Sequence, residues 1–195
     1  YALGEGFFSN ENKKTTSYKG NKIPSLKPIK YAFGRIGLNY GASWAKNRSV
    51  DLSLIGSYIS SWDNSSSGTI SNHARTLQNT FVYEYGIRTW SVTFDGNLKI
   101  GGFNLHALAV WQDPRYRDFR HTEYFDDGTE NSVDYSNKYV TGISKWRIEI
   151  DPSYSWEKWK VAANLSFFPR QYASRNNLAY FNGRFESFAS VAWKC

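Results

Sequence analysis

Apolar and polar residues alternate along most of the chain from Phe33 to Trp193. In seven stretches every second residue avoids Lys, Arg, Asp and Glu over about 37 positions, where an overall charged content of 21% would place about eight. Successive side chains of a β-strand point to opposite faces, so each stretch is predicted to be a strand with one apolar and one polar face. The apolar sets begin at Gly34, Val50, Trp90, Phe103, Trp146, Trp159 and Phe185.

The positions between these apolar residues carry the charges of the same strands. Lys145, Arg147, Glu149 and Asp151 are i, i+2 neighbours on one strand face, and an internal charge ladder explains this spacing better than an acid–base site does. If the strands belong to a membrane barrel, this polar face lines the lumen. The residues expected to face the lumen are Arg35, Asn39, Asp95, His106, Lys145, Arg147, Glu149, Arg184 and Glu186.

The third strand is the longest, because apolar residues occupy odd positions over 77–87 and even positions over 90–100. A tight hairpin or one strand with a β-bulge would explain this change of phase. The bulge is favoured, since Gly86 to Thr89 lacks a residue pair suited to a hairpin turn. The seven strands are predicted at about 31–44, 50–62, 77–100, 103–111, 139–154, 159–172 and 178–193.

Connections between these strands differ in length at the two ends. Short turns are predicted at 46–48, 101–102 and 156–158, and longer loops at 63–76, 121–137 and 173–177. Short turns at one end and long loops at the other are typical of outer-membrane barrels. Residues 1–30 are polar and are expected to form a loop or arm.

Strand length and aromatic placement favour a membrane barrel over a soluble antiparallel sandwich. The predicted strands exceed the five or six residues typical of globular proteins, and a tilted strand of about 9–11 residues crosses a bilayer. Aromatic residues gather near the strand ends, as in interfacial girdles. The predicted fold class is therefore all-β, an antiparallel up-and-down transmembrane β-barrel segment. Seven is an odd number, so residues 31–195 are expected to be part of a larger barrel.

Several stretches resemble strands of a known family. Residues 182–191 (N-G-R-F-E-S-F-A-S-V) are similar to the G-R-W-E-T-F-A-G-V strand of TonB-dependent outer-membrane receptors, especially those of Bacteroidetes-like bacteria. Residues 102–108, 140–143 and 148–154 resemble barrel strands that precede it there. The segment from Leu26 to Gly34 is similar to that family's entry into a late strand, although Ile29 and Ala32 depart from its pattern.

This resemblance implies a late part of a barrel that imports a large nutrient, such as a siderophore, glycan or peptide, across the bacterial outer membrane. It implies outer-membrane lipid as a partner, and coupling to TonB through a plug domain that is not visible in this chain. A surface lipoprotein is a further candidate partner. A passive outer-membrane channel or structural barrel stays open as an alternative, as does a soluble β-sandwich binding module.

No catalytic constellation is visible. His73, His106 and His121 are far apart, and neither a zinc-binding spacing nor the alternating ligands of a calcium loop occurs. The net charge of +7 is spread out and no nucleic-acid-binding signature is present. We expect no enzyme activity, no cofactor, no metal and no nucleic-acid partner. Substrate contacts are expected in an aromatic and basic cluster at the loop end, formed by Arg115, Tyr116, Arg117, Phe119, Arg120, Tyr124, Phe125 and Tyr135.

Overall fold

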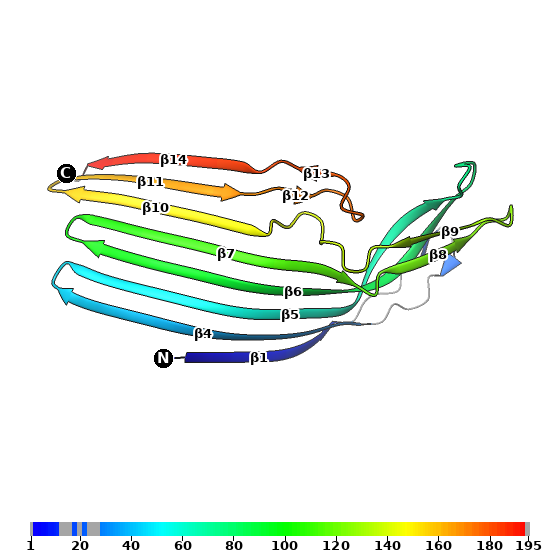
Figure 1. Cartoon of the computed structure of the whole chain (residues 1–195), viewed down its shortest axis with the longest axis horizontal. Helices are drawn as coiled ribbons and strands as arrows, with labels where there is room; N and C mark the ends of the chain where they lie inside the picture. Colours follow the sequence, from blue (N-terminus) through cyan, green and yellow to red (C-terminus); the bar gives the residue numbers. More distant parts are fainter. Residues whose placement is uncertain (1, 12–16, 19–20, 23–27, 194–195) are drawn as a thin grey trace.

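The computed structural model describes residues 2–11, 17–18, 21–22 and 28–193, and these form an all-β structure (Figure 1). Eight strands make one antiparallel sheet in which each strand lies beside its neighbour in sequence within that sheet. The prediction of an antiparallel up-and-down arrangement is confirmed. In sheet order the strands are β1 (Ala2–Glu11), β4 (Ile29–Ala45), β5 (Arg48–Ser71), β6 (Gln78–Ile100), β7 (Phe103–Arg117), β10 (Trp146–Trp156), β11 (Trp159–Phe168) and β14 (Arg184–Trp193).

Three pairs of short strands lie in the connections between the strands of the main sheet. They are β2 (Ser17–Tyr18) with β3 (Asn21–Lys22), β8 (Arg120–Tyr124) with β9 (Glu130–Asp134), and β12 (Gln171–Tyr172) with β13 (Tyr180–Phe181). All three occur on long connections, at the end of the sheet opposite the short turns (Figure 1). The predicted difference in loop length between the two ends is therefore confirmed.

The three short turns contain two residues each and lie beside one another. The Gly101 amide donates to the Asn47 carbonyl over 2.8 Å, and the Ser155 amide donates to the Gly102 carbonyl over 2.9 Å. Gly101 has a φ of 60°, and a Cβ at Gly102 would lie 2.1 Å from the Ser155 oxygen. Glycine is therefore required at both positions, the first for its backbone conformation and the second for close packing.

The amino-terminal segment differs from the expected polar arm. Ala2–Glu11 forms β1 and pairs in continuous register with β4, from Ala2 opposite Leu38 to Glu11 opposite Ile29. The unpaired edge of β4 offers backbone donors and acceptors, and ladder hydrogen bonds satisfy them whatever the side-chain composition. The main sheet thus has eight strands rather than seven. Leu26, Lys27 and Cys195 lie outside the described residues.

The long third strand is continuous, as predicted, but the bulge lies in its partner. β6 runs unbroken from Gln78 to Ile100, whereas the register of β5 shifts between Ser61 and Asn64, where Asp63 has a φ of 59°. The loop predicted at 63–76 is also wrong, because β5 continues to Ser71 as a paired strand. Backbone pairing with β6 overrides the turn-forming tendency of this Ser-rich and Asn-rich stretch. The two strands therefore project beyond the main sheet as a hairpin (Figure 1).

The fifth and seventh predicted strands begin later than expected. β10 begins at Trp146 rather than near Tyr139, because Gly142 adopts a φ of 77° and the chain turns before Trp146. β14 begins at Arg184 rather than near Leu178, after a turn in which Asn177 has a φ of 62°. Left-handed backbone conformations interrupt a strand, so these segments form irregular loops at the long-loop end.

One face of the main sheet is apolar and uncovered. We call the side that carries Ile36, Val92 and Ile150 the apolar face, and the opposite side, which carries Asp51, Asp95 and Glu149, the polar face. Ile36 is 66% exposed and Val191 of the same face is also 66% exposed. Among the described residues, the buried hydrophobic side chains all lie at the long-loop end: Ile70, Tyr83, Tyr116, Phe119, Phe125 and Val140. Burial within the chain therefore fixes the long-loop end and leaves the apolar face without a covering layer.

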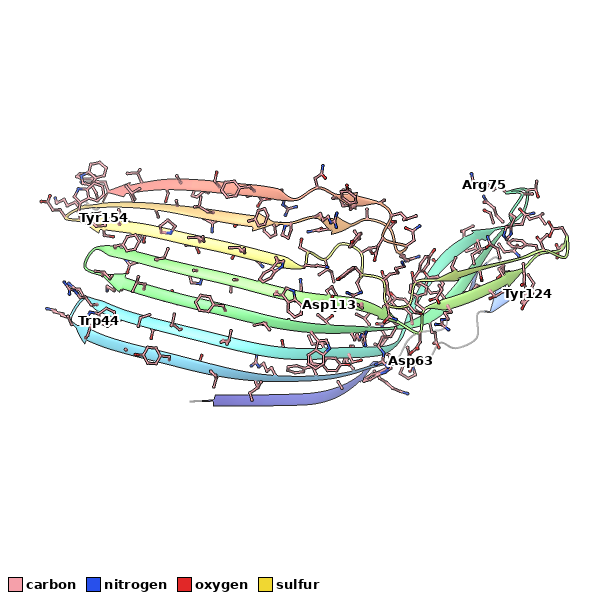
Figure 2. The ribbon with its side chains drawn as sticks, in the orientation of Figure 1. Trp44, Asp63, Arg75, Asp113, Tyr124 and Tyr154 are labelled. Atoms are coloured by element: carbon pink, nitrogen blue, oxygen red, sulfur yellow. The ribbon has the colours of Figure 1, made fainter. Side chains whose placement is uncertain are left out.

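A buried asparagine joins the β5–β6 hairpin to the β8–β9 hairpin. Asn72 is 2% exposed; its Oδ1 accepts from the Thr76 and Leu77 amides, and its Nδ2 donates to Asp127 over 2.8 Å. Two further bonds hold the same hairpins together, from Asn79 Nδ2 to Glu123 over 2.9 Å and from Asn131 Nδ2 to the Ser71 carbonyl over 2.8 Å. Figure 2 shows Arg75 and Tyr124 near the far ends of these hairpins, away from Asp63.

Replacing Asn72→Ala should loosen the β5–β6 tip. Leaving buried partners unsatisfied costs about 1–3 kcal/mol, so the Thr76 and Leu77 amides should exchange roughly 5- to 150-fold faster in hydrogen exchange. Asn97→Ala is the matched control, because Asn97 is exposed and makes one 3.4 Å bond to Asp95. Unchanged exchange at Thr76 and Leu77 in Asn72→Ala would contradict this role for Asn72.

Candidate functional site

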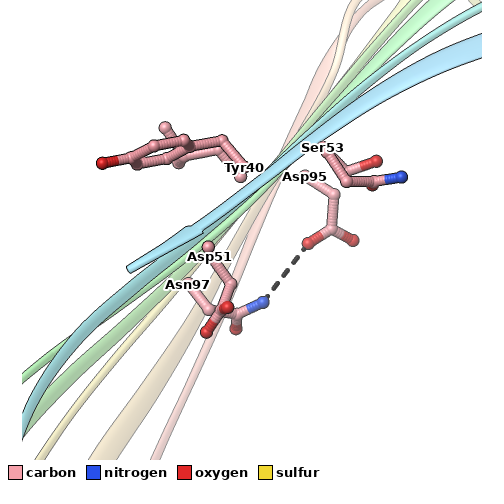
Figure 3. A pocket seen from close by; sticks show the side chains of 8 residues that line it. Tyr40, Asp51, Ser53, Asp95 and Asn97 are labelled. Atoms are coloured by element: carbon pink, nitrogen blue, oxygen red, sulfur yellow. Dashed lines mark hydrogen bonds between the residues drawn. The ribbon is translucent and has the colours of Figure 1, made fainter. Parts of the chain in front are cut away.

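The polar face contains an open acidic hollow near the short-turn end. Asn39, Asp51, Asp95 and Asn97 contribute to the lining of a cavity of about 670 Å³. Figure 3 shows Asp51, Asp95 and Asn97 on one side of the sheet and Tyr40 on the other, as strand alternation requires. A Cβ at Gly41 would lie 2.9 Å from Asp51 Oδ1, so glycine at this position leaves room for the carboxylate.

His106 lies at the centre of a polar network on this face. Its Nδ1 is 2.9 Å from Asp151 Oδ2 and its Nε2 is 3.5 Å from Asp95 Oδ1, so the ring bridges β6 and β10 across β7. Asn164 on β11 donates to the other oxygen of Asp151. The network therefore joins four neighbouring strands through side chains. The His106 ring thus forms a structural bridge between the carboxylates of Asp95 and Asp151.

Charged pairs continue across the polar face toward β14. Arg147 binds Glu149 on β10, and Arg184 binds Glu186 on β14 over 2.7 Å. Both pairs are i, i+2 neighbours on one strand face, which is the ladder that the sequence predicts. Phe168 lies between the strands, with the Arg184 guanidinium carbon 4.7 Å and that of Arg147 5.9 Å from its ring centre. Arg35 and Asn39 occupy alternate positions of β4 with the polar-face parity.

Aromatic side chains replace these charges where the polar face reaches the long loops. Tyr83, Tyr85 and Ile87 on β6 have the same parity as Asp95, and Tyr116 on β7 has the same parity as His106. Apolar residues therefore change sides along β6 without a bulge in β6 itself. Phe119 is completely buried against them, with ring centres 4.6 Å from Tyr83, 4.8 Å from Tyr85 and 5.1 Å from Tyr116.

We call this group, with Tyr135 and Val140, the loop-end aromatic cluster. The Tyr135 ring meets Phe119 edge-on at 5.0 Å, and its amide donates to the Phe119 carbonyl. Burial raises the pKa of Tyr85, with further contributions from Tyr116 and Tyr83. The raised pKa keeps this phenol neutral further into the alkaline range than an exposed tyrosine. The sequence predicts Tyr116, Phe119 and Tyr135 as binding residues, and the structure places all three inside this packed cluster.

Arg175 reaches the cluster from the connection between β11 and β14. Its guanidinium carbon is 5.4 Å from the Tyr83 ring centre and 6.0 Å from that of Phe119, and Nη2 donates to Ser66 Oγ over 3.0 Å. Sequence reasoning does not identify Arg175, which is a single cation in a polar loop. Tyr83 and Tyr85 are also missing from the predicted cluster, although the change of apolar phase over 77–87 marks them.

The remaining residues of the predicted cluster lie apart from one another. Arg120 pairs with Asp134 across the β8–β9 hairpin over 2.9 Å, and Tyr124 near its tip is 71% exposed. Phe125 is buried at the hairpin turn, and Arg117 lies opposite Gly86 at the end of β7. One contiguous binding surface made of all eight residues is therefore not present, because the connection folds back as a separate hairpin.

Arg115 lies on the other side of the sheet, beyond the apolar face. Its Nε binds Asp113 over 3.0 Å, Nη1 donates to the Asn137 carbonyl over 2.8 Å, and Nη2 donates to Tyr139 Oη over 2.6 Å. The Lys145 ammonium lies 4.0 Å from the centre of the same Tyr139 ring, so Lys145 is on this side and not on the predicted lumen side. The alternation does not orient Lys145, because β10 begins only at Trp146. Tyr139 stacks on Tyr172 with ring centres 5.4 Å apart. Arg115, Lys145, Tyr139 and Tyr172 thus form a cation–aromatic group. It lies next to Trp111 and Trp146, toward the long loops.

Two exposed aspartates of the β8–β9 hairpin have lowered pKa values. Hydrogen bonds from the Thr129 hydroxyl and amide lower the pKa of Asp127, and bonds from the Ser136 side chain and amide lower that of Asp134. Both carboxylates cap turns of the hairpin. Across the described ranges, no group of three His, Cys, Asp or Glu residues is arranged to hold a metal ion.

Phe119→Ala should release the connection between β7 and β10. Removing a completely buried phenylalanine costs about 3–5 kcal/mol of packing, and this connection depends on Phe119 for its contact with the sheet. Trypsin should then cleave faster at Arg117, Arg120 and Lys138, as followed by mass spectrometry. Tyr124→Ala removes an exposed ring of the same connection and should leave the cleavage pattern unchanged. Equal cleavage of both variants would show that the loop-end aromatic cluster does not hold this segment.

Comparisons with known proteins do not assign the chain to a family. No protein-family model matches it, and no curated protein matches its sequence. Within the described part of the chain, no helix is long and apolar enough to cross a membrane.

Proposed function

We propose that this chain forms part of the wall of an outer-membrane β-barrel that imports a large nutrient by TonB-coupled transport. The apolar face contacts lipid and the polar face lines the lumen. The observation that carries the membrane assignment is a pair of aromatic rows on the apolar face, one at each end. The chain contributes barrel wall, and a plug domain outside it contributes the coupling to TonB.

The long-loop row crosses four neighbouring strands and consists of Tyr58, Trp90, Trp111 and Trp146. Tyr58 lies opposite Trp90 with ring centres 4.3 Å apart, and Trp111 lies opposite Trp146. The short-turn row consists of Tyr154, Trp156, Trp159 and Trp193, and Figure 2 shows Tyr154 at that end of the sheet, with Trp44 of β4 at the same end. Amphipathic rings at both borders of an apolar band are typical of membrane interfaces.

The distance between the two rows matches a bilayer. Trp146 and Trp156 are ten residues apart on β10, or about 33 Å along the strand. A barrel strand is tilted by about 35–45°, which reduces this length to about 25 Å across the membrane, the height of the lipid-facing band of such barrels. Between the rows β10 presents Ile148, Ile150 and Pro152 to the apolar side. The same strand therefore has the length, the borders and the apolar content that lipid requires.

Two further observations support transport rather than a structural role alone. The polar face carries charges of both signs, which a water-filled or plug-filled lumen accommodates. The stretches similar to TonB-dependent receptors include residues 102–108 and 182–191, which lie largely in β7 and β14. Both fall on strands of the main sheet, at its middle and at its edge, as barrel-wall segments should. Specificity would come from the long-loop end together with the missing plug.

A passive channel is the second candidate, and the strand count favours it. The described main sheet has eight strands, an even number that is sufficient for a small closed barrel. β1 and β14 are its two edges and do not pair with each other in the described residues. Closure between these edges would give a narrow structural barrel whose interior side chains largely fill, whereas further strands would give a wide barrel able to hold a plug.

An arginine in the middle of the apolar band tests the orientation. Ile150→Arg should destabilise the membrane-inserted protein by about 2–4 kcal/mol, because it places a cation near the bilayer midplane. Ser153→Arg is the control, since Ser153 lies on the polar face of the same strand. Urea unfolding in phospholipid vesicles measures the change in the free energy of unfolding for each variant. Equal costs at the two positions would contradict a lipid-facing apolar side.

Uptake measurements separate the two transport mechanisms. In cells that produce the protein, accumulation of labelled ferric siderophores, oligosaccharides or peptides should depend on the protein and should stop when TonB is deleted. Porin-mediated uptake of a small sugar provides the control, because it needs no TonB. Protein-dependent uptake that continues without TonB would favour the passive channel over energy-coupled import.

A further inference from the structure

A small cavity lies beside the long-loop row, where the apolar face gives way to polar loops. Its volume is about 140 Å³, the share of four or five water molecules in the liquid. It lies between the segment that enters β10 and the segment that leaves β11. The lining consists of Tyr139, Ile143, Lys145, Trp146, Pro169, Arg170 and Tyr172. This lining includes two cations and no carboxylate.

Both cations have donors left for a ligand. Among the described residues, Lys145 and Arg170 form no ion pair with a carboxylate and donate no side-chain hydrogen bond. Lys145 lies over the Tyr139 ring, and the Arg170 guanidinium carbon lies 5.2 Å from the Tyr180 ring centre and 5.8 Å from that of Tyr172. Contact with ring faces positions a cation without using up its N–H groups.

Arg115 removes the competing carboxylate from the cavity. Asp113 is close enough to interact electrostatically with Lys145, but its two oxygens accept from Arg115 Nε over 3.1 and 3.0 Å. Arg115 is itself hydrogen-bonded to Asp113, Asn137 and Tyr139, and the carboxylate of Asp113 offsets its charge. The charge left over in this region is therefore positive and belongs to Lys145 and Arg170.

The walls of the cavity are held in place by hydrogen bonds between its two segments. Ser144 Oγ donates to the Pro169 carbonyl over 3.1 Å and accepts from Gln171 Nε2 over 2.9 Å, and the Gly142 amide donates to the Tyr172 carbonyl over 2.9 Å. Asn177 accepts from the Tyr139 amide over 2.6 Å and donates to its carbonyl over 3.0 Å. A site built from bonded segments is largely preformed, which lowers the cost of binding.

A second hollow lies on the apolar face, across the paired residues Trp111 and Trp146. It has a volume of about 380 Å³, and its lining includes Ile36, Gly56, Val92 and Trp111. Gly56 has open space where a Cβ would be, so the hollow exists because this position lacks a side chain. Trp146 lines the cationic cavity and Trp111 lines the apolar hollow, and the two residues lie opposite each other in register.

The geometry points to a binding site for a phosphate-bearing membrane lipid, whose phosphate is held by Lys145 and Arg170 and whose acyl chains cover the apolar hollow. This inference rests on the proposed membrane orientation of the sheet. Two unpaired cations select an anionic head group, and Trp111 and Trp146 mark the boundary at which head group and chains separate. Inorganic phosphate would satisfy the cations but gains nothing from the apolar hollow.

Native mass spectrometry of the detergent-purified full chain tests the site. Dioleoyl phosphatidic acid should bind at least tenfold more tightly than dioleoyl phosphatidylcholine or inorganic phosphate. The double variant Lys145→Gln with Arg170→Gln should bind phosphatidic acid about 30-fold more weakly, because a cation near an anionic lipid surface contributes about fivefold each. Lys99→Gln with Lys160→Gln removes the same charge from the polar face and should leave the affinity unchanged.

Three results would overturn the inference. They are equal lipid binding in the two double variants, equal affinity of inorganic phosphate and phosphatidic acid, and equal affinity of the two lipids. Insertion into phosphatidylcholine vesicles, measured by flotation, separates these failures from a failure of the proposed function. A chain that inserts but lacks lipid selectivity contradicts the lipid site alone, whereas a chain that does not insert contradicts both proposals.

Discussion

The two-residue period of the β-strand is the constraint on which this structure depends. Each strand of the main sheet must present its side chains alternately to two environments, and β6 continues as one strand from Gln78 to Ile100. A change in which side is apolar must therefore be made by the sequence. It occurs near Trp90, where the apolar residues move from one side of β6 to the other. Between Trp90 and the short turns, the apolar side chains are not covered by any other part of the described chain. Between Trp90 and the long loops, the chain buries its own aromatic side chains.

This switch divides the molecule into two parts with different sources of stability. Between the aromatic rows, the sheet is held by backbone ladders and by polar bridges such as that of His106, and its apolar side chains are left uncovered. Beyond Trp90, Phe119 and its neighbours form a packed core that needs no other molecule. The long-loop end thus has a core of its own, whereas the apolar face of the main sheet is left for another layer to cover.

The sequence predicts most of the main sheet but only part of the candidate site at the long-loop end. Alternation and turn length predict the long strands β4 to β7 and β11 and place residues such as Asp95 and Glu149 on the polar side, because period and charge are local properties. Pairing is not local: Ala2–Glu11 becomes a strand because an edge is available, and β5 continues through Ser-rich residues because β6 is opposite. Arg175 and Tyr139 acquire their roles from segments distant in sequence, which no pattern within one strand can reveal. The positive φ values of Gly142 and Asn177 likewise end strands that the alternation alone would extend.

The contacts of Arg175 with β5 and β6 have a consequence for the shape of the main sheet. The residue belongs to the connection between β11 and β14, yet it hydrogen-bonds Ser66 of β5 and lies over Tyr83 of β6, with β7 and β10 between them in the sheet. This contact ties the long-loop ends of β5, β6 and the β11–β14 connection together on the side of Tyr83, which has the polar-face parity. If further strands joined β1 or β14 and the sheet closed, this tie would favour curvature toward the polar side, so that the charged residues would face the interior.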